Sequence, residues 1–571
     1  MTHHHGTMSA PPAATRWSTA ALLLILSVTA VAHHTANAGE SLPADTSKYV
    51  AVEPLRLADT RVGEGAYGFT TVDANTVRVD IAHRPGVPGD ASAAVVNLTV
   101  VDTTGPNFVV AFPTGTRVPA SSNVNTDSPG QIVANLVHVK VGDGGSIDIR
   151  MLHPVDIVVD LVGVYVPVAG AVAAGRLVTL PGGAQRVIDT RQRGIPVAPR
   201  ATTTVNLAVA GVPIDAAAAV VTITAVDAQP GYWTAHSTGR TRPGVSTMNI
   251  DAPGQTRAAQ AIVTLHDGIR SIAVFSTNTG HLIVDVVGWF TGPSAPLDTA
   301  GLFVPAPPQR MLDTRISRTL APWAQSTYEV PTGSPFANVS AVAMNITALE
   351  AWSPGFVTAY PAGVQRPGSS NLNLPNWQHV VAAHAIVAVS SRGVALYTNA
   401  GAHLIADVAG WYLGTPATPT QAPLDSPDHA PNVVAAVHLP SLGVFAAARN
   451  GPDANAIVDQ GFAAVTGTLS QLAAPGNVML FAHRTTGAAP FRRIDQLKPG
   501  NSFSLIGSDG RTYYYVVVRT SVTSPSPEAI AAQAIGAGPV TAQLVACSKA
   551  NGAATSLKYR IVVTGRLVGI G

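Results

Sequence analysis

The chain has 571 residues, enough for about four domains at roughly 150 residues each. Charged residues make up 12% of the chain, and its formal net charge is +2. The sequence contains no run of more than two adjacent Lys or Arg residues, which argues against a nucleic-acid-binding protein. Beyond residue 40, no apolar run reaches the ~18 residues that cross a bilayer.

The N-terminal segment is typical of an export signal. Arg16 precedes an apolar stretch over residues 20–32, and a small-residue cleavage motif follows at residues 36–38. We therefore expect residues 1–38 to be a signal peptide and the protein to be exported, to the extracellular space or the cell envelope. An uncleaved membrane anchor is the competing interpretation, although the apolar stretch is short for a spanning helix.

Three similar segments follow, with a period of about 125 residues. Each opens on Asp-Thr-Arg, continues with an apolar strand-like run, and closes on an apolar run that holds one Asp. The opening motifs end at Arg61, Arg191 and Arg315, and the closing acids are Asp160, Asp285 and Asp407. Similarity in a fixed order indicates tandem modules, and β-branched runs between closely spaced turn signals favour β-sandwiches or barrels.

We expect these repeat modules at residues 48–168, 175–292 and 302–414. They resemble a repeat of secreted actinobacterial proteins for which no firm activity is known. Contact of the repeats with the cell envelope is one hypothesis for their role, and the presentation of partner proteins is another.

Paired side chains in the repeats raise the question of a metal or catalytic site. His281 and Asp285 are four residues apart, as are His403 and Asp407, which places each pair on one face of a strand. The first repeat has Asp156 instead of the His, which weakens this hypothesis. We favour the alternative that the recurring Asp and Arg residues pair within each module and fix a turn. No metal or cofactor is expected.

Residues 415–432 are rich in Pro and Thr and are expected to form an extended linker. A different kind of sequence occupies residues 433–571. It contains the single cysteine of the chain, Cys547, which cannot form a disulfide within the chain.

Cys547 ends one apolar strand-like run, His483 follows another, and Arg560 lies early in a third. Taken singly, each has an ordinary structural interpretation as a core cysteine, a loop histidine or a solvated arginine. Together they suffice for acyl transfer. A thiolate attacks a peptide carbonyl, an imidazole exchanges protons, and a guanidinium stabilises the oxyanion.

The text PGNVMLFAHRTTGAAPFRRIDQLKPG, followed in order by RTYYYVVV, QLVAC and YRIVV, resembles the catalytic domain of the sortase family, especially class E. The resemblance covers about residues 433–571. It implies an eight-stranded β-barrel, so the whole chain is expected to be mainly β. It also implies a cysteine transpeptidase with Cys547 as nucleophile, His483 as general acid/base and Arg560 supporting the oxyanion or substrate.

The resemblance further implies the partners. One is a secreted protein with an LAXTG-like or LPXTG-like sorting signal, cut between Thr and Gly, and the other is a peptidoglycan-precursor amine that receives the acyl group. Two residues depart from the family pattern, Ala546 in place of Thr and Ala482 in place of Gly. A surface-structural or adhesive protein with an inactive sortase-like domain is therefore an alternative, as is a different cysteine-dependent acyl transferase or peptidase.

Overall fold

A computed structural model provides the structure of the chain, and it describes residues 42–570 with gaps. The gaps are 63–66, 267, 316–325, 352–353, 376–378, 422–432, 443, 450–453, 460–462, 467–475, 486–488, 508–510, 535–539 and 551–557. The expected signal peptide and most of the expected linker therefore lie outside the described residues. Within the described ranges, no helix is both long and apolar enough to cross a membrane.

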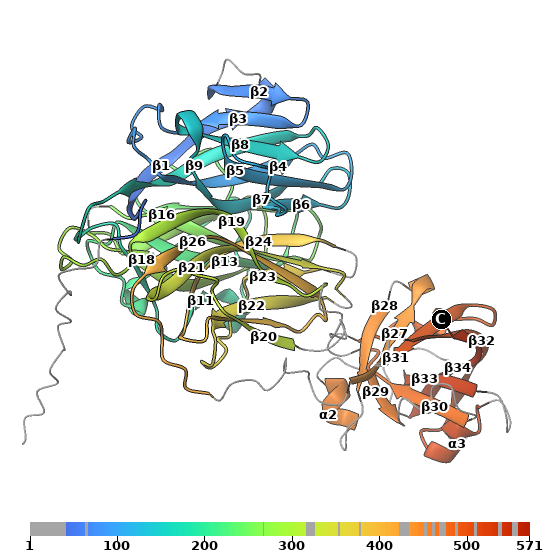
Figure 1. The fold of residues 1–571 in the computed structure, drawn as a ribbon. Helices are drawn as coiled ribbons and strands as arrows, with labels where there is room; N and C mark the ends of the chain where they lie inside the picture. The colour runs from blue at the N-terminus through green and yellow to red at the C-terminus, as the bar shows by residue number, and fades with distance from the viewer. Residues whose placement is uncertain are drawn as a thin grey trace, which may run out of the picture. The chain divides into compact units, whose positions relative to one another are not determined.

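The chain is mainly β, as predicted (Figure 1). Three groups of strands, which we call modules 1, 2 and 3, precede the C-terminal barrel. Module 1 contains β1 (Ser47–Asp59), β2 (Phe69–Asp73), β3 (Thr76–Asp80), β4 (Ala93–Val101), β5 (Asn107–Pro113), β6 (Val124–Thr126), β7 (Val133–Lys140), β8 (Ser146–Met151) and β9 (Asp156–Pro167).

Module 2 contains β10 (Leu177–Thr179), β11 (Gln185–Asp189), β12 (Ala201–Asn206), β13 (Ala218–Ala228), β14 (Gly231–Ser237), β15 (Met248–Ile250), β16 (Gln255–Thr264), β17 (Ser271–Ser276) and β18 (His281–Phe290). Module 3 contains β19 (Phe303–Asp313), β20 (Ser326–Val330), β21 (Val339–Leu349), β22 (Gly355–Pro361), β23 (Leu372–Leu374), β24 (Val381–Ala388), β25 (Val394–Thr398) and β26 (His403–Leu413).

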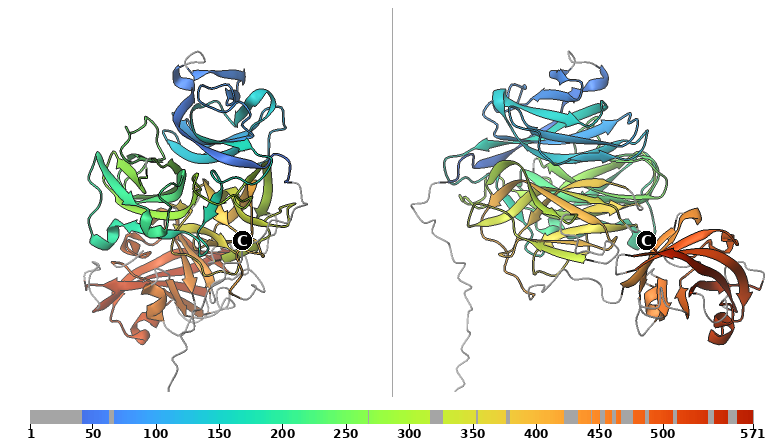
Figure 2. Two further views of the ribbon diagram at one scale, coloured as in Figure 1. Left: turned by 90° about the vertical axis from the view of Figure 1, so that its left-hand side faces the viewer. Right: turned by 45° about the vertical axis from the view of Figure 1, so that its right-hand side comes forward.

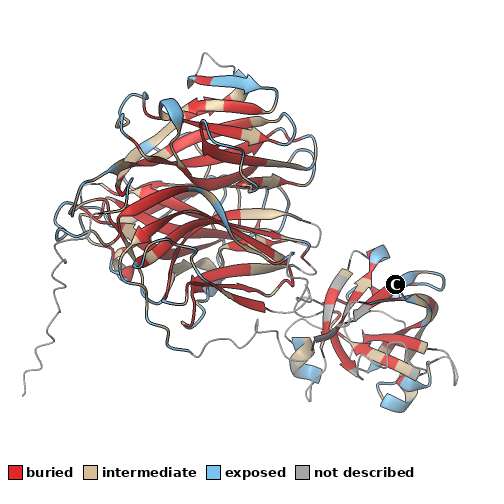
Figure 3. Ribbon diagram, in the orientation of Figure 1, coloured by how far each residue is buried: buried red, intermediate tan, exposed pale blue. Residues whose placement is uncertain are grey.

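Each module is a sandwich of two antiparallel sheets. The strands of the first layer share one order, β1-β9-β4-β7 in module 1, β11-β18-β13-β16 in module 2 and β19-β26-β21-β24 in module 3. Pairing of β1 with β19 at Ser47 and Phe303 joins the first layers of modules 1 and 3 into one eight-stranded sheet. The second sheets run β2-β3-β8-β5-β6, β12-β17-β14-β15 and β20-β25-β22-β23. An apolar core fills the space between the two sheets of each module, so the strands are buried along most of their length (Figure 3).

A further core is shared by the modules. It contains the aromatic side chains of Tyr49, Tyr165, Phe290, Phe303 and Tyr412, all of which are buried. Tyr165 and Tyr412 are joined by a 2.5 Å hydrogen bond between their hydroxyl groups. This aromatic packing joins modules 1, 2 and 3 through apolar burial.

The barrel contains β27 (Val433–Leu439), β28 (Val444–Arg449), β29 (Ala463–Thr466), β30 (Gly476–Phe481), β31 (Ser502–Gly507), β32 (Thr512–Thr523), β33 (Val540–Ser548) and β34 (Tyr559–Ile570). These strands close in the order β27-β28-β29-β30-β33-β34-β32-β31 and curl around a common interior (Figure 2). Two short helices accompany them, α2 (Ala454–Asp459) and α3 (Pro527–Ala531). The predicted eight-stranded barrel is confirmed.

Candidate active site

Cys547 and Arg560 lie opposite each other on neighbouring strands. Cys547 is the penultimate residue of β33, and the antiparallel register of β33 with β34 pairs it directly with Arg560. Their inward-facing neighbours, Ala546 and Ile561, belong to the barrel core. Because successive residues of a strand point to opposite faces, Cys547 and Arg560 share the outer face of the barrel.

His483 follows the strand on the other side of Cys547. β30 runs parallel to β33 with Phe481 opposite Val545, and the backbone N–H of Ala482 donates to the carbonyl of Val545 at 3.2 Å. His483 comes one residue later, at the level of Cys547. The parallel pairing therefore brings His483 to the end of the same three-stranded surface, although it lies 64 positions earlier in the sequence.

The imidazole of His483 contacts a carboxylate that no sequence motif identifies. Its Nε2 lies 2.8 Å from Oδ1 of Asp459, the last residue of α2. The His483 side chain is 25% exposed and that of Asp459 is 70% exposed, so the contact lies at the surface of the barrel. In the described residues, no hydrogen bond joins His483 to the Cys547 thiol.

Arg484 is a second residue that the sequence analysis did not identify. Its side chain is 2% exposed, and its Nη2 donates to Oδ1 of Asp495 at 2.6 Å. Its Nη1 donates to the backbone carbonyl of Cys547 at 3.4 Å. A buried guanidinium requires such acceptors. Arg484 thereby joins the loop after β30 to the end of β33 and positions the backbone that carries Cys547.

Helix α3 packs on the outer face beside these residues. Ile530 contacts Val545 and Val562, the outward-facing neighbours of the site on β33 and β34, and Phe481 packs against the same cluster. The side chain of Gln543 donates to the Ile530 carbonyl at 3.1 Å. Helix α3 therefore covers the outer face next to Cys547 and buries Val545 and Val562 there.

The two departures from the family pattern both lie on the opposite face. Ala482 and Ala546 are buried in the barrel core, with 6% and 3% exposure. A hydroxyl at position 546 would point into that core and away from Cys547. The face that carries Cys547 and Arg560 is therefore unaffected by the missing hydroxyl.

The recurring acids of the modules are bound by arginines, as the preferred hypothesis stated. The Asp-Thr-Arg pairs are Asp59–Arg61, Asp189–Arg191 and Asp313–Arg315, with N–O distances of 2.7, 2.7 and 2.6 Å. The closing acids pair as Asp160–Arg56, Asp285–Arg186 and Asp407–Arg310, at 2.5, 2.9 and 2.6 Å. The hydrogen bond from Arg315 lowers the pKa of Asp313 to about 2. Burial raises the pKa of Asp160, Asp285 and Asp407.

The histidines of the repeats have a structural contact in common. His281 and His403 each approach a Thr hydroxyl of the Asp-Thr-Arg motif through Nδ1, at 3.1 and 3.2 Å. Asp156 accepts a hydrogen bond of 2.7 Å from the matching Thr60 in module 1. The described residues contain no group of three or more His, Cys, Asp or Glu side chains arranged to hold a metal ion. His281, His403 and Asp156 thus each contact the opening turn of their own module.

Comparison with known proteins agrees with the geometry of the barrel. Residues 437–568 match the family model of the Sortase domain. No curated protein matches the chain.

Similar solved structures include sortase E1 from Streptomyces coelicolor with a tripeptide in its active site (26% identity, 24% of this chain, 90% of that chain, TM-score 0.21). They also include sortase C-1 from Actinomyces oris (23% identity, 24% of this chain, 76% of that chain, TM-score 0.21). A third is sortase A from Listeria monocytogenes (21% identity, 24% of this chain, 89% of that chain, TM-score 0.21). The family match assigns a sortase domain to the C-terminal part of the chain, and the predicted resemblance is confirmed there.

Proposed function

We propose that this sortase domain is an active cysteine transpeptidase that works outside the cell, with Cys547 as nucleophile, His483 as general acid/base and Arg560 at the oxyanion. One observation carries the proposal. Cys547 and Arg560 are paired across neighbouring strands on the outer face of the barrel, and His483 follows the strand on the other side of Cys547.

In the first half-reaction, the sulfur of Cys547 attacks the carbonyl carbon of the Thr–Gly bond in a sorting signal. His483 accepts the thiol proton and returns a proton to the departing Gly amine as the C–N bond breaks. The guanidinium of Arg560 donates hydrogen bonds to the oxyanion of the tetrahedral intermediate. The product is a thioester between Cys547 and the substrate's Thr.

In the second half-reaction, an amine of a peptidoglycan precursor attacks the thioester carbonyl. His483 accepts the amine proton, the C–S bond breaks, and the thiol of Cys547 is restored. The substrate is a secreted protein with an LAXTG-like or LPXTG-like signal. The contact between Asp459 and His483 supports this role, because it orients the imidazole while Nδ1 stays available for proton exchange.

Incubation of the full chain with an LAXTG or LPXTG peptide and an amine acceptor tests the proposal. We expect a ligated product that depends on the amine and is absent for Cys547→Ala. Cleaved peptide at the same rate with and without the amine would indicate a peptidase. No turnover of either peptide would favour the alternative, a structural or adhesive protein in which the modules are the working part.

A further inference from the structure

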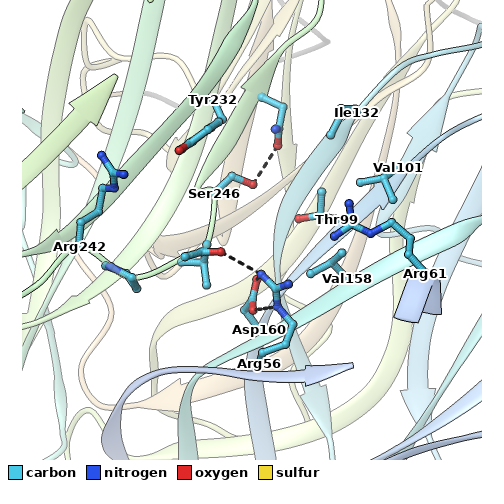
Figure 4. Close-up of a pocket in the computed structure, with 14 residues that line it drawn as sticks. Arg56, Arg61, Thr99, Val101, Ile132, Val158, Asp160, Tyr232, Arg242 and Ser246 are labelled. Carbon is cyan, nitrogen blue, oxygen red and sulfur yellow. Dashed lines mark hydrogen bonds and ion pairs between the residues drawn. The ribbon is translucent and has the colours of Figure 1, made fainter. Parts of the chain in front are cut away.

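A cavity of about 380 Å³ lies between modules 1 and 2 (Figure 4). Module 1 contributes Arg56, Arg61 and Asp160 to its lining, and module 2 contributes Tyr232, Arg242 and Ser246. Three arginines therefore line the cavity together with one carboxylate. Arg61 and Arg242 stand on opposite sides of it, each from a different module (Figure 4).

The carboxylate is already neutralised. Arg56 binds both oxygens of Asp160, at 2.5 and 3.4 Å, and also donates to Oδ2 of Asp59 at 3.0 Å. Its Nη2 also donates across the module boundary to the carbonyl of Gly244 at 3.0 Å. Arg56 and Asp160 thus form a closed structural unit at the base of the cavity. Asp59 likewise neutralises Arg61, so Arg242 supplies the positive charge that remains on the walls.

Arg61 and Arg242, on opposite sides of the cavity, both have guanidinium N–H groups that can donate to a ligand. Arg61 uses Nε and Nη2 to bind Asp59, at 2.8 and 2.7 Å, and its Nη1 makes no hydrogen bond within the described residues. Arg242 makes no ion pair in the described part of the chain. Its guanidinium lies 3.7 Å above the ring of Phe275, which orients it without using its N–H groups.

Module 3 also contains an arginine that is stacked on an aromatic ring. Arg366 lies 3.6 Å above the ring of Tyr397, and the adjacent carbonyl of Gly368 accepts a 2.8 Å hydrogen bond from Arg186 of module 2. The corresponding loop of module 1 carries Arg117. The strand position that holds the stacking ring in the other modules is occupied by Arg150 there, and Arg117 stacks on no aromatic ring among the described residues. Two of the three module boundaries thus present a stacked arginine.

We propose that the cavity between modules 1 and 2 binds a phosphate group of an anionic polyol-phosphate polymer. Guanidinium groups on opposite walls suit a tetrahedral anion, which offers acceptor oxygens in several directions, better than a planar carboxylate. A second stacked arginine on the same chain favours a ligand whose anionic groups repeat. The modules would thereby hold the barrel beside an anionic surface polymer, whether or not the barrel is catalytic.

The test is binding of the full chain to linear poly(glycerol phosphate), measured by calorimetry, with inorganic phosphate and polygalacturonate as comparison ligands. We expect Arg242→Gln to weaken polymer binding by about tenfold, the worth of one charge-assisted hydrogen bond. Arg117→Gln removes the same charge from the unstacked loop and should leave binding unchanged. Arg242 and Arg117 are both exposed, so we expect neither substitution to destabilise the fold.

The comparison ligands distinguish the sources of the anion. Weak binding of inorganic phosphate that Arg242→Gln abolishes supports the same site. Equal losses in Arg242→Gln and Arg117→Gln would overturn the proposal, because they would indicate nonspecific charge attraction. Polygalacturonate binding as tightly as the phosphate polymer would overturn the phosphate assignment, and wild-type affinity in Arg242→Gln would exclude the cavity.

Discussion

Acid should destabilise the modules through a pair of buried histidines. His138 and His384 are stacked in the core that the modules share, with ring centroids 4.6 Å apart and planes inclined by 8°. The Nδ1 of His384 lies 3.1 Å from Oε1 of Gln260, and its Nε2 is buried without a hydrogen-bond partner in the described residues. Protonation would place a charge and an unpaired donor there. Burial accordingly lowers the pKa of His384 to about 3.

The size of the effect follows from linkage. An unfolded histidine titrates near pH 6.5, so between about pH 6.5 and 3 the unfolded chain binds a proton that folded His384 does not. The stabilising contribution is complete above that window and is lost as the pH falls. Between pH 7 and pH 5, His384 alone should cost about 2 kcal/mol of unfolding free energy. Burial and the neighbouring His384 also lower the pKa of His138, which adds in the same direction.

Urea unfolding at pH 7 and pH 5 measures this, with tryptophan fluorescence as the probe. No tryptophan follows Trp411, so the signal excludes the barrel, and Trp233 is buried in module 2. His384→Gln should lose about 2 kcal/mol less than the wild type between the two pH values. His153→Gln, which removes an exposed histidine, should behave as the wild type. An unchanged pH dependence in His384→Gln would refute the reasoning.

Three further predictions concern the barrel. Arg560→Lys should lower the ligation rate by about a hundredfold, because a lysine cannot reproduce the planar fork at the oxyanion, and wild-type turnover would remove that role. Asp459→Asn should slow ligation by only roughly two- to fivefold, since its contact with His483 is exposed, and a loss of all activity would mean that Asp459 does more than orient the ring. Arg484→Gln should lower the unfolding free energy of the barrel by about 1–3 kcal/mol, which thermal melting of Cys547→Ala with and without this change would measure. Equal melting temperatures would mean that the buried contacts of Arg484 add no stability.

The β class and the barrel could be predicted because alternating β-branched runs and the HRTT and VAC motifs are local features of the sequence. The positions of Cys547, His483 and Arg560 near the ends or starts of strands could also be predicted from the apolar runs beside them. Their common face depends on register, and a shift by one residue would have moved Cys547 into the core. No spacing rule reveals that register.

Other parts of the site depend on long-range contacts. Asp459 precedes His483 by 24 positions, on a helix that no local signal links to the histidine. Arg484 directly follows His483 in the quoted motif, but its burial against the carbonyl of Cys547 is a tertiary feature. The bond from Arg56 to Gly244 joins residues 188 positions apart, and sequence repetition alone does not say that modules pack together.

The central claim, that Cys547 is an active sortase nucleophile, is tested most directly by intact mass spectrometry of the full chain mixed with an LAXTG or LPXTG peptide and no amine. We expect an adduct with the mass of the peptide's acyl fragment up to Thr, located on Cys547, released by added amine and absent in Cys547→Ala. No adduct with either peptide, together with a Cys547 thiol that resists alkylation at neutral pH, would contradict it.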